Sequence, residues 1–118
     1  MRKAFAHNAE LLMAQTGDTG APGAAITVAL CGHREHQPCP LAPHHSHANR
    51  EGDTVHVRTL FVVEPGKANA VHHRIDEALR GGEMCGPDGV TTHWELRRSE
   101  HADASADEAG HAERLIQT

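Results

Sequence analysis

Residues 32–53 restrict the fold more than any other part of the chain, because they offer almost nothing with which to build a core. The segment contains three prolines, many histidines and almost no large apolar side chain. A segment this long in a small domain must be functional, disordered or held in place by something else. The sequence therefore predicts a long loop here, and an ordered loop of this kind would need an interaction other than a hydrophobic core to stabilise it.

The rest of the chain can build only one small core. Its 118 residues are 38% hydrophobic, and Phe5, Phe61 and Trp94 are its only aromatic residues. A chain of this length fits one domain better than two. Its core must consequently be aliphatic and rich in alanine.

The spacing of apolar residues predicts the elements of this domain. Alternation at period two predicts strands over residues 24–31, 54–63 and 90–98. Spacings of three and four predict a helix over residues 66–80 that crosses over between the last two strands. Two further segments have helical composition, residues 3–15 and residues 104–116.

These elements predict an α+β domain with a small three-stranded mixed sheet, one face of which is covered by the crossover helix. Residues 1–23 would form an N-terminal helix and linker. Residues 24–98 would form the core, including a Cys/His-rich metal-binding loop at residues 31–53. Residues 99–118 would form an acidic C-terminal helix or tail.

Charge and composition exclude several classes of protein. Eleven basic and sixteen acidic residues give a net charge of -5, so there is no basic field for nucleic acid. No segment approaches the roughly 20 apolar residues of a membrane-spanning helix. Polar residues within the first ten positions argue against a secretory signal. We therefore expect a cytoplasmic protein, and nine arginines against two lysines are typical of GC-rich bacteria.

Histidine and cysteine carry the chemical signal. There are twelve histidines and three cysteines, and an odd number of cysteines does not suit the disulfide framework of a secreted protein. Thiolates and imidazoles close together favour zinc, with copper or nickel as alternatives. The local donors are Cys31, His33, His36, Cys39, His44, His45 and His47.

The predicted topology brings this loop, Cys85, His56 and His93 to one rim of the sheet. The favoured zinc ligands are Cys31, Cys39, Cys85 and His33, with His36 or His44 as the substitute for the last. Such a site would clamp the loop, and structural zinc can supply on the order of 10 kcal/mol of folding free energy.

Three other interpretations stay open. The loop could be a solvated segment with adventitious metal affinity. An enzyme could keep one metal position open for water, with Glu35, Asp53 or Glu95 as proton acceptor. An interaction module could bind a protein partner or a second copy through an exposed sheet face. That face would carry His56, Arg58, His93, Glu95 and Arg97.

The remaining histidines are expected to have no special role. His72 and His73 lie on the predicted helix, and both are interpreted as surface residues with acidic neighbours four positions on. His7, His101 and His111 have no supporting context in the sequence.

Overall fold

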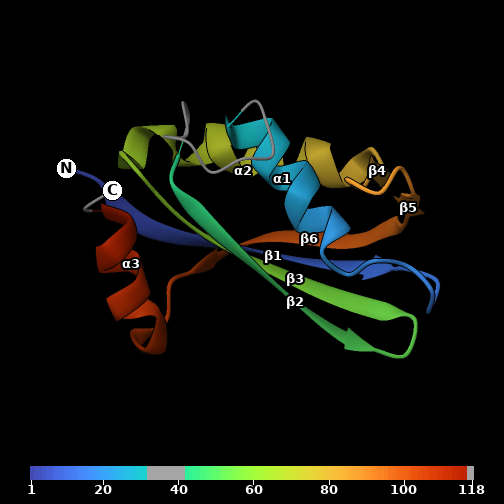
Figure 1. Cartoon of the computed structure of the whole chain (residues 1–118). Helices are drawn as coiled ribbons and strands as arrows, with labels where there is room; N and C mark the ends of the chain where they lie inside the picture. The colour runs from blue at the N-terminus through green and yellow to red at the C-terminus, as the bar shows by residue number, and fades with distance from the viewer. Residues whose placement is uncertain (32–41, 117–118) are drawn as a thin grey trace.

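Two helices lie on one face of a four-stranded antiparallel sheet, and a third helix lies against the other face at one end (Figure 1). The computed structural model describes residues 1–31 and 42–116. The sheet strands are β1 (Lys3–Leu12), β2 (His44–Glu51), β3 (Thr54–Val63) and β6 (Glu95–Asp103). The helices are α1 (Ala21–Cys31), α2 (Ala68–Arg80), which follows a short 3₁₀ turn η1 (Pro65–Lys67), and α3 (Ala109–Ile116), which follows η2 (Ala106–Glu108).

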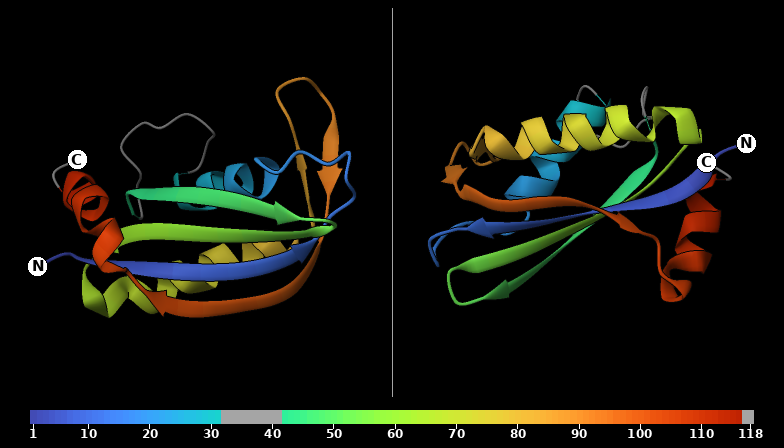
Figure 2. Two further views of the ribbon diagram at one scale, coloured as in Figure 1. Left: turned by 90° about the horizontal axis from the view of Figure 1, so that it is seen from below. Right: turned by 180° about the vertical axis from the view of Figure 1, so that it is seen from behind.

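The strands follow the order β2-β3-β1-β6 across the sheet. In chain order this is β-α-β-β-α-β, the split βαβ or ferredoxin-like arrangement. A small second sheet, β4 (Glu83–Cys85) paired with β5 (Thr91–His93), is inserted between α2 and β6. Figure 2 shows this hairpin at the end of the sheet where β1 stops, beside the start of α1.

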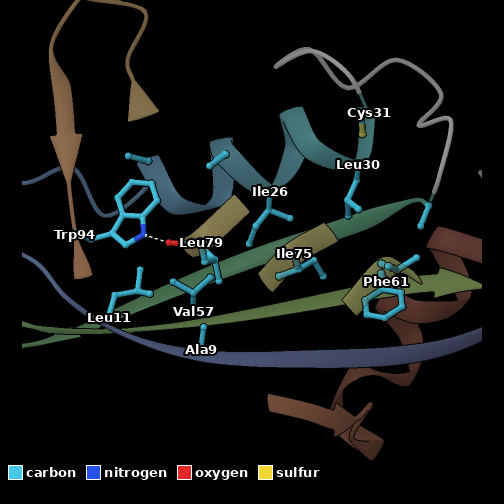
Figure 3. Close-up of a cluster of buried hydrophobic side chains, with 14 of the residues drawn as sticks. Ala9, Leu11, Ile26, Leu30, Cys31, Val57, Phe61, Ile75, Leu79 and Trp94 are labelled. Atoms are coloured by element: carbon cyan, nitrogen blue, oxygen red, sulfur yellow. Dashed lines mark hydrogen bonds between the residues drawn. The ribbon is translucent and has the colours of Figure 1, made fainter. Parts of the chain in front are cut away.

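The core fills the space between the sheet and the two helices that cover it (Figure 3). Leu11 of β1 and Phe61 of β3 are fully buried against Ile26 of α1 and Ile75 of α2. Trp94 closes one end, where its indole Nε1 donates a 2.8 Å hydrogen bond to the carbonyl of Leu79. The core is therefore aliphatic, with one buried phenylalanine and one nearly buried tryptophan.

Several predicted elements are confirmed. The strand over residues 54–63 is β3, the helix over residues 66–80 corresponds to η1 and α2, and the C-terminal helix exists. The predicted crossover differs in detail, because the sheet expected to be mixed is antiparallel throughout. Because β3 and β6 both pair antiparallel with β1, they run parallel to each other, with β1 between them.

Two predicted elements have the wrong secondary structure. Residues 3–15 were expected to be helical, but β1 is a central strand that alternates His7, Ala9 and Leu11 toward the helices. Alanines on both faces and a histidine on the buried face hide that alternation. Residues 24–31 were expected to be a strand, but they belong to α1. This helix is apolar on nearly all sides, so it lacks the one-sided pattern that distinguishes a helix from a short apolar strand.

The predicted three-stranded sheet has a fourth strand, because β2 forms within the segment expected to be a loop. Its side chains are histidines and small or polar residues, so nothing in their hydropathy predicts a strand. Backbone pairing with β3 forms it instead, through a two-residue turn at Gly52 and Asp53. Gly52 has a φ of 62°, which suits the first position of such a turn. The strand expected over residues 90–98 is divided into β5 and β6, and β6 continues to Asp103.

The C-terminal segment is tied to the sheet by one arginine. The Arg58 guanidinium forms a two-pronged ion pair with Glu108, through contacts of 2.9 and 2.8 Å. Hydrogen bonds from Arg58 lower the pKa of Glu108 to about 2. Glu108 also accepts a hydrogen bond from the backbone of Ser105 in a capping box, so the same carboxylate starts the last helix and anchors it.

Replacement of Gly82 by alanine should destabilise the protein. Gly82 has a φ of 72°, and a Cβ there would lie 2.9 Å from the carbonyl oxygen of Trp94. We expect Gly82→Ala to lower the free energy of unfolding by about 1–3 kcal/mol in urea denaturation. The matched control is Gly66→Ala, where a Cβ meets nothing within 4 Å and should change stability by less than about 0.5 kcal/mol. Equal effects of the two substitutions would contradict this account.

Candidate functional sites

The end of α1 and the start of β2 bring one cysteine and one histidine together. Cys31 is the last residue of α1, and His44 is the first residue of β2. Both side chains are buried, and the Cys31 Sγ lies 3.9 Å from the His44 Nδ1. Two such donors on one tetrahedral zinc ion would be about 3.6 Å apart, from Zn–S and Zn–N bonds of about 2.3 and 2.0–2.1 Å.

The other ring nitrogen of His44 is held in place. Its Nε2 lies 3.0 Å from the Thr27 hydroxyl, one helical turn before Cys31. A hydrogen bond to the second nitrogen is the usual way in which proteins orient a metal-binding histidine. His44 Nδ1 is also 3.3 Å from the carbonyl of Ala42, so that nitrogen can donate when no metal is bound.

Only part of the predicted ligand set can be placed beside this pair. His33, His36 and Cys39 lie outside the described residues, as does Glu35. Cys31 forms a disulfide in this structure, so its sulfur is not a free thiolate. A metal could bind this sulfur only after reduction.

Cys85 is not brought to the same place. It is a free, exposed cysteine in β4, where it lines a hollow together with Ala21 and Ala24 from the first turns of α1. Cys31 is at the opposite end of that helix, about 15 Å away at 1.5 Å per residue. The expected convergence depended on residues 24–31 being a strand, and the helix removes it.

The other predicted rim residues are also dispersed. His45 packs against His111 of α3, with ring centroids 4.5 Å apart, and His93 lies 3.4 Å from Glu83 across the small hairpin. Asp53 is in the turn at the far end of β2 from His44. Glu95 pairs with Arg97 at 3.2 Å.

A second site lies on the helix-covered side of the sheet, where three histidines from three elements meet. His7 comes from β1, His72 from α2 and His101 from β6. The Nδ1 atoms of His7 and His72 are 2.9 Å apart, and the rings of His72 and His101 stack with centroids 3.6 Å apart. We call the space beside them the histidine hollow. Its volume is about 300 Å³, and it is lined by His7, Asn69, His72, His73, Asp76, Ser99 and His101.

Burial keeps two of these histidines uncharged. His7 and His72 are 3% and 4% exposed, and burial lowers the pKa of each to about 4. The neighbouring His101 lowers both pKa values further. A hydrogen bond between two imidazoles needs one donor and one acceptor, which two neutral rings can supply.

The hydrogen-bonded chain continues from the histidines to a serine. The His7 Nε2 lies 2.7 Å from the hydroxyl of Ser99 in β6. Asp76 lines the same hollow as Ser99. Burial alone would raise the pKa of Asp76, but hydrogen bonds from Arg80 and Ser99 lower it. The arrangement therefore places a carboxylate, a hydroxyl and two neutral imidazoles in sequence beside one hollow.

Sequence reasoning missed this site, because His7, His72 and His101 were interpreted as residues without a special role. The sequence pattern that pointed to this site was weak. His72 borders the apolar stripe of α2, and His7 alternates with Phe5, Ala9 and Leu11 in β1. Assigning β1 as a strand would have placed His7 on the buried face.

A third feature is a groove of about 370 Å³ on the sheet face that α1 and α2 leave uncovered. We call it the sheet-face groove. It is lined by Asn8, Ala9, Glu10, His47, Asn49, His56, Val57, Arg58, Arg98 and Glu100. The sequence predicted an interaction face of five residues. His56 and Arg58 line the sheet-face groove, whereas His93, Glu95 and Arg97 do not.

Within residues 1–31 and 42–116, no three His, Cys, Asp or Glu side chains already converge as a metal site. In the same part of the chain, no helix has the length and apolar character needed to cross a membrane. No protein-family model, curated protein or solved structure matches this chain.

Acid should destabilise the fold through His7 and His72. Their pKa values are near 4 in the folded state and about 6.5 when exposed, so the unfolded chain takes up protons first as the pH falls below about 6.5. This contribution to stability is complete above pH 6.5 and is lost down to about pH 4. Each imidazole can contribute up to about 3 kcal/mol over this range, so we expect the free energy of unfolding to fall by about 3–6 kcal/mol between pH 7 and pH 4.

Urea denaturation at a series of pH values tests this expectation. His72→Gln should weaken the pH dependence, because it removes one of the two buried imidazoles. His73→Gln is the control, since His73 is exposed on the same helix and pairs with Glu77. A pH dependence that is the same in His72→Gln as in the parent would contradict the assignment.

Proposed function

We propose that this protein is a small metal-binding protein, with zinc as the most available ion and copper or nickel as alternatives. The observation that supports this most is the pairing of Cys31 with His44. One soft donor and one borderline donor are buried together, with the histidine oriented by Thr27. In the sequence, Cys31 and His44 flank residues 32–43, which contain the other predicted ligands of the loop.

The remaining ligands in this proposal come from His33, His36 and Cys39, which the sequence places within eight residues of Cys31. Two of these donors would complete a tetrahedral set with Cys31 and His44. Cys85 is not included in the proposed ligand set, because it lies near the start of α1, whereas Cys31 is at the end of that helix.

The disulfide at Cys31 makes the proposed binding dependent on redox state. Metal ions bind the thiolate, so the disulfide form would hold no metal at this sulfur and the reduced form would. We propose a cytoplasmic location, where thiols are kept reduced.

Metal binding should require a reductant. We expect isothermal titration of the tag-free protein with zinc to show about one tight site per chain after reduction with a phosphine, and no tight site while the disulfide is intact. Cys31→Ser and His44→Gln should each weaken binding at least tenfold. Melting curves with and without zinc would show whether the metal stabilises the fold.

Cys85→Ser is the matched control, because it removes a thiol that lies apart from the proposed site. It should leave zinc affinity unchanged. If zinc binds as tightly to Cys31→Ser as to the parent, or if Cys85→Ser alone abolishes binding, the proposed ligand set is wrong.

A second candidate is an interface at the sheet-face groove. The groove carries Glu10 and Glu100 beside Arg98, and a face with both charges can be complementary to itself across a two-fold axis. This favours a second copy of the chain as partner. Sedimentation should show a dimer that salt and Arg98→Glu both weaken. A monomer at all concentrations and low salt would exclude this partner.

A further inference from the structure

We propose that Ser99, His7 and His72 form a second functional site, in which the Ser99 hydroxyl accepts an acyl group from a small carboxylic ester in the histidine hollow. The proposal concerns a different part of the molecule from the metal pair. Cys31 and His44 are on α1 and β2, whereas these three residues are on β6, β1 and α2. Evidence against one of the two proposals would therefore leave the other unaffected.

The geometry supplies the parts of a serine nucleophile and its base. The Ser99 Oγ lies 2.7 Å from the His7 Nε2, within the range for proton transfer to a general base. The His7 Nδ1 lies 2.9 Å from the His72 Nδ1, so a second ring fixes the orientation of the base. Nucleophile, base and orienting group in this order are the general signature of an activated hydroxyl.

Attack requires one set of tautomers: His7 donates from Nδ1 to the Nδ1 of His72. The Ser99 hydroxyl must also turn its proton from the Asp76 carboxylate to the His7 Nε2. Ser99 attacks the ester carbonyl as His7 takes this proton, and the proton passes to the departing alcohol as the carbon–oxygen bond breaks. Water then releases the acid by the reverse transfers and restores Ser99. No metal, oxidant or further reactant is consumed.

The hollow sets the class of substrate. About 300 Å³ is at the lower limit of small-molecule sites, so the acyl group and alcohol must be small. Asn69 lines the same hollow and offers a side-chain amide of the kind that stabilises an oxyanion. Burial makes His7 a weak base, which suits an ester with a good leaving group better than an amide.

Three further titratable side chains line the histidine hollow: His73, which pairs with Glu77, and His101 and Asp76. His101 stacks on His72 from the exposed side, and Asp76 lies beside Ser99. Protonation of His101 disfavours a proton on His7, whereas the Asp76 carboxylate favours one. Asp76 therefore stabilises the His7 imidazolium that forms during the attack.

The test uses the full chain with p-nitrophenyl acetate. We expect an initial burst of p-nitrophenol and an acetyl group on Ser99, located by peptide mass spectrometry. Ser99→Ala should abolish both. His7→Gln should slow acylation by about 100-fold, a typical loss for a general base. Ser46→Ala is the matched control, because Ser46 pairs with the Thr59 hydroxyl rather than with an imidazole, and it should acylate Ser99 at the parental rate.

His72 acts as a positioning residue, so its test is the pH profile. In the parent, acylation should fall as His7 becomes protonated in acid, and His72→Gln should move the midpoint of that fall as well as lower the rate. Circular dichroism of each variant checks that the fold is retained. Imidazoles also react with this ester, so hydrolysis that persists unchanged in Ser99→Ala would overturn the proposal, as would the absence of an acetyl group on Ser99.

Discussion

The pairing of β1 with β3 over ten residues is the interaction on which the rest of the structure depends. It places two alternating strands at the centre of the sheet, so that Leu11 and Phe61 face the helices and Glu10 and His56 face the other way. The core against α1 and α2 then forms on the side that carries most of the apolar side chains. The other side stays polar, except at the end where α3 covers it.

Both proposed sites lie where polar side chains interrupt this apolar layer. His44 enters at the edge, in a strand that exists only because β3 pairs with it. His7 enters at the centre, between Phe5 and Ala9, and its two ring nitrogens contact His72 and Ser99. A buried polar group without such partners costs about 1–3 kcal/mol, so each histidine requires its neighbours. This requirement gives the two sites their fixed geometry.

The strongly patterned parts of the chain could be predicted, and the weakly patterned parts could not. Strand β3 and helix α2 were predicted because their apolar residues recur at one clear period. For β1 and α1 the assignments were exchanged, because alanine suits both structures and α1 is apolar on almost every side. Strand β2 was missed because an edge strand can form through backbone hydrogen bonds alone. Local patterns contain no information about such pairing.

The sequence by itself determined an α+β domain with an aliphatic core and the chemistry of its donors, imidazole and thiol. These properties follow from composition and short-range spacing. Only the tertiary structure decided which donors meet. His7 contacts His72 across 65 positions and Ser99 across 92, whereas Cys85 and Cys31 are held at opposite ends of one helix. Contacts at such separations depend on strand order and register, which arise from the packing of the whole chain rather than from any segment of it.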